Sequence, residues 1–142
     1  MISEYGKYEY GDDKVDGYGN IVAIGQIEAE ILYTSILPDA DTSRTILMEI
    51  DDDPPDGLRL MVTTAADSLG YDDESKGGTN GSLVSTDARA ITAATPLTLV
   101  SGIGSVELAQ LFVDLTVDIV DMGRLRADAS KTINATYTLT AD

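Results

Sequence analysis

Hydrophobic and polar residues alternate in five segments of the chain. Apolar side chains take every second position over residues 27–33, 46–50, 58–62, 111–120 and 132–140. Because successive side chains of a strand point to opposite faces, this pattern predicts strands that are buried on one face. Shorter apolar runs between these segments add further strands. The sequence therefore predicts an all-β fold: an immunoglobulin-like, two-sheet antiparallel sandwich of about seven to nine strands.

An acidic turn with two prolines separates two of these segments. Residues 51–57 read Asp-Asp-Asp-Pro-Pro-Asp-Gly, and prolines and glycines interrupt regular structure. The segments on either side are therefore predicted to form a hairpin-like pair over residues 45–64. Residues 65–82, which are rich in glycine and polar residues, form the longest predicted loop.

The segment that begins at Ser105 allows two interpretations. Its apolar residues fit a helical stripe as far as Leu115. From residue 111 onward, however, the strict alternation includes β-branched residues, which favour strands over helices. We therefore expect a strand over residues 111–120, and a helical turn remains the alternative for residues 106–110.

The first 20 residues differ from the rest in composition. They contain four of the seven tyrosines, interleaved with glycines: Tyr5, Tyr8, Tyr10 and Tyr18. This pattern predicts an extended N-terminal arm at residues 1–20, followed by the sandwich domain at residues 21–142. The arm has two equally weighted interpretations. It adds a strand to another subunit and builds a homo-oligomer or filament, or it pairs with the sheet of its own chain.

The charge of the chain limits its partners. Nine Lys and Arg residues against 25 Asp and Glu give a formal net charge of −16. Such a surface repels phosphate backbones and anionic lipid, so we expect no nucleic-acid partner. No segment is apolar over the length of a membrane helix, so no membrane insertion is expected. The start of the chain also lacks the basic and apolar regions of a signal peptide.

The residue types needed for common catalytic sites are missing. The chain has no cysteine and no histidine, which excludes Ser-His-Asp and Cys-His catalysis and ordinary zinc sites. Asp114 and Asp118 would lie roughly 13 Å apart along one strand, too far for either glycosidase geometry. We therefore predict no catalytic and no cofactor-binding residues, and interpret these two aspartates as part of an outward polar face.

One acidic cluster is a candidate metal site. It comprises Asp51, Asp52, Asp53 and Asp56. Several carboxylate oxygens at flexible geometry are what calcium requires, although the spacing is not that of an EF-hand loop. The alternative, which carries more weight, is a solvated acidic turn between two strands.

The last third of the chain resembles a known family. A Thr-Pro-Leu-Thr-Leu run at 95–99 precedes Gly-Ile-Gly at 102–104, the long strand at 111–120, and the closing Ile-Asn-Ala-Thr-Tyr-Thr-Leu-Thr at 133–140. This order resembles the C-terminal half of bacterial pilin-type immunoglobulin-like sandwiches, as in spore coat U and chaperone–usher pilins. Many of those pilins carry a disulfide, which this chain lacks. The resemblance implies a filament subunit whose terminal arm completes a neighbour's sheet, and no site residues carry over.

Three functions follow as hypotheses. The first is a structural subunit of an extracellular filament or pilus at the cell surface, self-assembling by exchange of the N-terminal arm. The second is a phage or viral structural protein, such as a decoration or tail subunit located in the virion. The third is a calcium-dependent adhesin or carbohydrate-binding module. An enzyme is the least favoured class.

Overall fold

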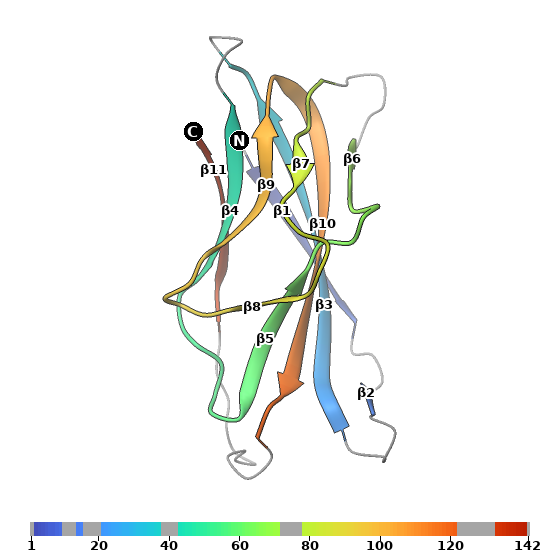
Figure 1. Ribbon diagram of the computed structural model, residues 1–142. Helices are drawn as coiled ribbons and strands as arrows, with labels where there is room; N and C mark the ends of the chain where they lie inside the picture. Colours follow the sequence, from blue (N-terminus) through green and yellow to red (C-terminus); the bar gives the residue numbers. More distant parts are fainter. Residues whose placement is uncertain are drawn as a thin grey trace.

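The computed structural model describes most of the chain. The described residues are 2–9, 14–15, 21–37, 43–71, 78–121 and 133–141, with side chains from residue 27 onward. All regular structure in these residues is β-strand, arranged as two antiparallel sheets packed face to face (Figure 1). The expected all-β, two-sheet antiparallel sandwich is therefore confirmed.

The larger sheet has seven strands. They are β1 (Ile2–Glu9), β2 (Lys14–Val15), β3 (Ile21–Ser35), β5 (Leu58–Thr63), β6 (Leu69–Tyr71), β8 (Arg89–Ile91) and β10 (Val106–Ile119). The order across the sheet is β1-β3-β10-β5-β8, with β2 also paired to β3 and β6 to β10. Because β5 and β6 both pair with β10, they act as one strand interrupted by a turn.

The smaller sheet has four strands. They are β4 (Arg44–Ile50), β7 (Ser82–Leu83), β9 (Leu97–Ile103) and β11 (Ala135–Ala141), in the order β11-β4-β9-β7. Strand β6 of the larger sheet lies within residues 65–82, and β7 begins at residue 82, so the described part of that region is more regular than the predicted loop.

The connections between strands cross from one sheet to the other. From β3 to β11, every pair of consecutive strands except β5 and β6 is divided between the two sheets. The predicted hairpin over residues 45–64 is therefore wrong: β4 pairs with β9 and β11, whereas β5 pairs with β10 and β8. The acidic turn after β4 instead carries the chain across the roughly 10 Å gap between packed sheets. This strand order resembles the double Greek key of a jelly roll.

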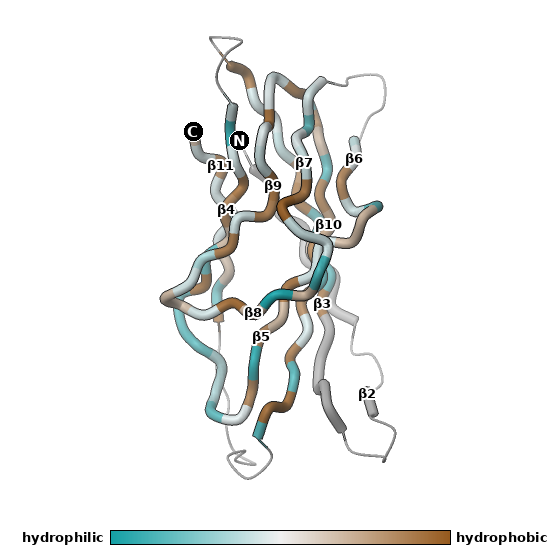
Figure 2. Tube along the Cα trace, viewed as in Figure 1, coloured by the Kyte–Doolittle hydropathy of each residue, from teal (hydrophilic) through white to brown (hydrophobic). Residues whose placement is uncertain are grey.

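The predicted alternation describes the core well. Ile31 on β3, Met48 on β4 and Leu111 on β10 are each 0% exposed. Their neighbours two positions away are also buried, and apolar and polar positions alternate along these strands in Figure 2. Both sheets thus contribute apolar side chains to one shared core, which drives their packing.

A bulge explains the helix-like spacing that follows Ser105. Residues 106–119 form the single strand β10, so the helical alternative for residues 106–110 is wrong. The register on β3 shifts between Val106 and Ala109, and Leu108 has a positive φ of 52°. The extra residues of the bulge place Val106 and Ala109 on the same buried face despite a spacing of three. Such a spacing in the sequence imitates a helical stripe.

Candidate assembly interface

The N-terminal segment adds a strand to the edge of its own chain's larger sheet. β1 pairs antiparallel with β3 over eight residues, from Ile2 opposite Tyr33 to Glu9 opposite Gln26. Tyr5 and Tyr8 of the predicted assembly arm lie in this strand, opposite Glu30 and Ile27. Tyr10 and Tyr18 lie outside the described residues. This pairing corresponds to the interpretation in which the arm pairs with the sheet of its own chain.

The edge that β1 covers belongs to a strand of the core. β3 carries the buried side chains of Ala29, Ile31 and Tyr33, and its other edge is paired with β10. On the opposite face of β3, the carboxylate of Glu30 accepts a 2.6 Å hydrogen bond from Gln110 of β10. Without β1, the backbone of this long strand would be exposed along one side. A bare edge of that kind pairs readily with any extended chain.

A second long edge lies on the same side of the sandwich. β11 is the outer strand of the smaller sheet and, among the described residues, pairs only with β4. β1 and β11 approach each other, and the start of β1 and the end of β11 lie at the same end of the molecule (Figure 1). β11 reads Ala-Thr-Tyr-Thr-Leu-Thr-Ala and contains no charged residue. In the sequence, this strand is recognisable as an uncharged run in a very acidic chain.

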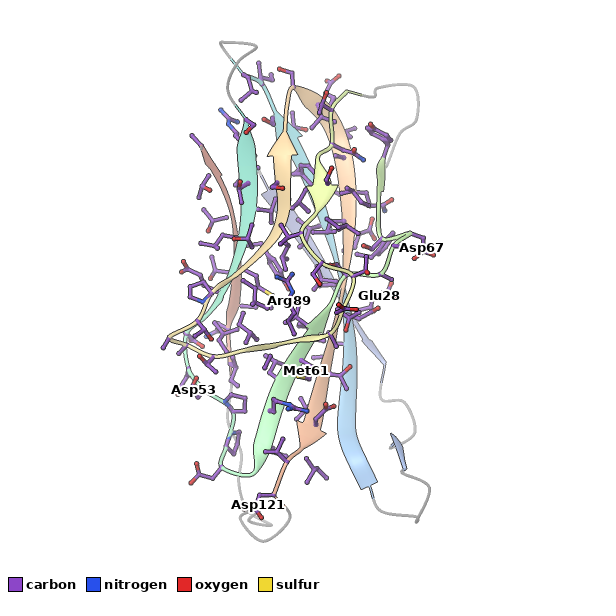
Figure 3. The ribbon with its side chains drawn as sticks, viewed as in Figure 1. Glu28, Asp53, Met61, Asp67, Arg89 and Asp121 are labelled. Atoms are coloured by element: carbon purple, nitrogen blue, oxygen red, sulfur yellow. The ribbon has the colours of Figure 1, made fainter. Side chains whose placement is uncertain are left out.

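The acidic turn holds neighbouring segments together through hydrogen bonds. Asp51, Asp52, Asp53 and Asp56 are all exposed. The Asp51 carboxylate accepts two hydrogen bonds from Asn134, each 2.8 Å long, and Asp53 Oδ1 accepts one of 2.7 Å from the backbone N–H of Ala93. In Figure 3, Asp53 points toward the turn that follows β8.

Carboxylate oxygens of Asp51, Asp52 and Asp53 thus take part in the hydrogen bonds of the turn. The side chain of Asp52 also accepts a 2.8 Å bond from the N–H of Asp53. Within the described ranges, no group of three or more acidic side chains is arranged to hold a metal ion. The cluster is visible in the sequence as a run of aspartates, but its hydrogen-bond partners Asn134 and Ala93 lie far along the chain.

Asp114 and Asp118 lie on the outward face of β10. They alternate with the residues of the buried face, such as Val113. Asp118 Oδ2 accepts a 3.4 Å hydrogen bond from Arg59 Nη2 on the neighbouring strand β5.

Two tyrosine hydroxyls fix the segment around residues 78–81. Tyr33 donates a 2.6 Å hydrogen bond to the backbone carbonyl of Asn80, and Tyr71 donates one of the same length to that of Gly78. Asn80 in turn donates its side-chain amide to the carbonyl of Gly70 at 3.3 Å. Burial raises the pKa of the Tyr33 hydroxyl, and the nearby Tyr71 adds to the rise. The side chain of Tyr33 therefore stays neutral and ties β3 to the start of β7.

Comparison with protein-family models, with characterised proteins and with solved structures finds no match to this chain. Among the residues that the structure describes, no helix of membrane-spanning length and hydrophobicity occurs.

Proposed function

We propose that the protein is a structural subunit that assembles with copies of itself by exchanging β1 between neighbours. The observation that carries the proposal is the pairing of β1 with β3 over eight residues at the very edge of the larger sheet. The strand lies outside the crossing connections that build the sandwich. It can therefore leave one sheet and join another without disturbing the rest of the fold.

Exchange makes the same backbone hydrogen bonds in either arrangement. When an identical element moves to a neighbouring copy, its contacts are reproduced there, and this is why swapping is a low-cost route to oligomers. The concentration of subunits and the geometry of the connecting segment then decide which form prevails. A net charge of −16 opposes close approach of two copies at low ionic strength, and salt relieves this repulsion. The same charge keeps an assembled surface soluble.

The location that suits this role best is outside the cell, in a filament or pilus, as the resemblance of the last third to pilin-type sandwiches suggests. A virion is the second candidate. It is favoured by one specific observation: the strand order β3-β10-β5-β8 against β4-β9-β7 is like that of jelly rolls, an architecture common in viral capsids. Strand exchange would serve either assembly.

The test uses the absence of cysteine from the chain. The register places Lys7 directly opposite Glu28, and directly opposed residues of antiparallel strands lie within reach of a disulfide. Single Lys7→Cys and Glu28→Cys chains are mixed, incubated at high concentration and oxidised. Exchange predicts a cross-linked dimer that contains one copy of each. Lys7→Cys mixed with Glu49→Cys is the control, because Glu49 is exposed on β4 in the other sheet.

A second variant makes the test reversible. The chain with both Lys7→Cys and Glu28→Cys, oxidised when dilute, locks β1 onto its own sheet. We expect this form to lose the assemblies that the parent shows by light scattering and negative-stain electron microscopy, and to regain them with reductant. A parent chain that stays monomeric throughout, with cross-links only within single chains, would refute strand exchange.

A further inference from the structure

We propose that Asn80 is a site of spontaneous covalent modification: the backbone nitrogen of Gly81 displaces its side-chain amide, which leaves aspartate or isoaspartate at position 80. This inference does not depend on exchange of β1. It rests on the sequence at this position, on the hydrogen bonds of the peptide unit that joins the two residues, and on the close packing of Gly81 against β9.

Asn80 is the only asparagine of the chain that is followed by glycine. Asn20 and Asn134 both precede residues that carry a side chain. The attacking nitrogen belongs to the residue after the asparagine, and a side chain on that residue hinders its approach. Glycine has no Cβ and the widest conformational freedom, so this pair is the most reactive of the three. Asn80 and Gly81 also lie outside the strands, between β6 and β7.

The backbone nitrogen of Gly81 is not held by the smaller sheet. The N–H of Val84 donates a 3.0 Å hydrogen bond to the carbonyl of Leu99, and β7 pairs with β9 without a shift. Because hydrogen-bonded residues alternate along an antiparallel strand, even-numbered residues here bond to β9 and the N–H of Gly81 points away from it. Within the described part of the chain, nothing accepts a hydrogen bond from this N–H. The nitrogen can therefore react without breaking a bond of the sheet.

Tyr33 stabilises the reactive form of this peptide unit. When the nitrogen of Gly81 loses its proton, the negative charge is shared with the carbonyl oxygen of Asn80. That oxygen accepts the 2.6 Å hydrogen bond from the hydroxyl of Tyr33. A hydrogen bond to an ionised acceptor is roughly twice as strong as one to a neutral acceptor, so this bond favours the anion. Burial raises the pKa of the Tyr33 hydroxyl, which keeps the donor protonated at the mildly alkaline pH that promotes the reaction.

The net reaction consumes one water and releases one ammonia. Hydroxide removes the proton from the nitrogen of Gly81, which then bonds to Cγ of Asn80. The bond from Cγ to Nδ2 breaks, and Nδ2 takes a proton from water and leaves as ammonia. Water then opens the cyclic imide at one of its two carbonyl carbons. Attack at Cγ gives aspartate, whereas attack at the main-chain carbon gives isoaspartate, whose main chain is longer by one carbon.

Both products weaken the contacts of this segment. Nδ2 of Asn80 donates a 3.3 Å hydrogen bond to the carbonyl of Gly70 in β6, and a carboxylate loses this donor and repels the carbonyl oxygen. Isoaspartate also lengthens the main chain next to Gly81. A Cβ added at Gly81 would already lie 2.6 Å from the carbonyl oxygen of Ser101 and 2.7 Å from Val100 Cγ1, so an extra carbon has no room. We therefore expect the two-residue strand β7 to loosen from β9, which uncovers that edge of the smaller sheet.

The test follows position 80 while the full chain is incubated at mildly alkaline pH. Trypsin releases residues 77–89 and 132–142, each with a single asparagine, Asn80 and Asn134, so mass spectrometry compares both sites in one digest. We expect aspartate and isoaspartate to accumulate at Asn80 well before Asn134. Tyr33→Phe should slow the conversion of Asn80 by about fivefold, because the charge-assisted hydrogen bond is lost. Tyr71→Phe is the control: it removes a bond to the carbonyl of Gly78, a different peptide unit, and should leave the rate unchanged.

Amide hydrogen exchange supplies the structural readout. The N–H of Val84, which is bonded to the carbonyl of Leu99, should exchange faster as the modified chain accumulates. The N–H of Val120, which is bonded to the carbonyl of Gly57 at 2.8 Å, lies beyond the other end of β10 and should not change. Asn80→Asp places the carboxylate without lengthening the main chain, so it should produce a smaller increase at Val84.

The proposal is overturned if Asn80 is converted no faster than Asn134 in the folded chain, or if Tyr33→Phe and Tyr71→Phe react at the same rate. Unchanged exchange of Val84 in the fully converted chain would overturn the release of β7.

Discussion

The carboxylate of Asp51 accepts two hydrogen bonds from Asn134, one from its backbone N–H and one from its side-chain amide, each 2.8 Å long. The N–H of Asp51 returns a 3.1 Å bond to the carbonyl of Asn134. Three bonds thus join two residues that are 83 positions apart in the sequence. They hold the start of β11 against the end of β4, and so fix the register between these two strands.

Removing this carboxylate should destabilise the sandwich. Asp51→Ala deletes two charge-assisted hydrogen bonds, and because Asp51 is exposed we expect a loss of about 1–2 kcal/mol in the free energy of unfolding. Urea denaturation measures this loss. Asp67→Ala is the control: Asp67 is also exposed, on the far side of the molecule from Asp53 in Figure 3, and should change stability by less than about 0.5 kcal/mol. Equal effects of the two substitutions would contradict the role assigned to Asp51.

Calcium should not bind tightly at the acidic turn. Coordination of the ion needs several free oxygens, and the carboxylates of Asp51, Asp52 and Asp53 already accept hydrogen bonds. We therefore expect that millimolar calcium raises the melting temperature no more than magnesium does at the same ionic strength. A saturable rise specific to calcium, and abolished by Asp53→Asn, would instead restore the calcium site inferred from the sequence.

The buried tyrosine Tyr33 should make the fold sensitive to alkali. Burial raises the pKa of its hydroxyl above the ordinary value of 10.0, so the unfolded chain releases this proton at lower pH than the folded chain does. The stabilisation is fully present below about pH 10 and is lost as the pH rises from there toward the folded-state pKa, by up to about 1.4 kcal/mol per pH unit. Urea denaturation at pH 8 to 11 measures the slope.

Tyr33→Phe removes the ionisable hydroxyl of Tyr33. The variant therefore loses both the alkaline decrease in stability and the 2.6 Å hydrogen bond to Asn80. At pH 8 the variant should be less stable than the parent by about 1 kcal/mol, and the difference should shrink above pH 10. Tyr71→Phe is the comparison, since it also removes a hydroxyl bonded to a backbone carbonyl but keeps Tyr33. Parallel pH profiles for the parent and Tyr33→Phe would show that Tyr33 does not control the alkaline loss.

The sequence predicted the faces of the strands better than their partners. Alternation identified Ile31, Met48 and Leu111 as core residues, because period-two burial is a local property of a strand. It placed β4 and β5 in one hairpin because the pattern does not say which sheet a strand joins. The helix-like start of β10 came from a bulge, whose extra residues change the spacing without changing the buried face.

The candidate sites were predictable only in part, for a related reason. The acidic turn was visible as a run of aspartates, but its role depends on Asn134 and Ala93, which only the folded chain brings near. The N-terminal arm was inferred from composition, whereas the register of β1 on β3 depends on backbone pairing, which composition does not encode. The uncharged run of β11 was present in the sequence, but its position at the edge of the smaller sheet follows only from the strand pairing of the folded chain.

Three glycines should respond differently to the same substitution, because they differ in space and in backbone conformation. Gly81 has a φ of +93°, and a Cβ there would lie 2.6 Å from the carbonyl oxygen of Ser101 and 2.7 Å from Val100 Cγ1. Gly102 has a φ of +67° but no atom within 4 Å of such a Cβ. At Gly70 the space is also open and no positive φ is required.

Gly81→Ala adds a steric clash to the strain of a positive φ, so we expect a loss of more than about 3 kcal/mol or failure to fold. Gly102→Ala carries the conformational strain alone and should cost about 1–2 kcal/mol. Gly70→Ala should be neutral or stabilising by up to about 1 kcal/mol, because it restricts the unfolded chain. Chemical denaturation of the three variants gives the order of their free energies of unfolding. If Gly81→Ala were no worse than Gly102→Ala, the close approach of Gly81 to β9 would be wrong, and with it the position of β7 at the edge of the smaller sheet.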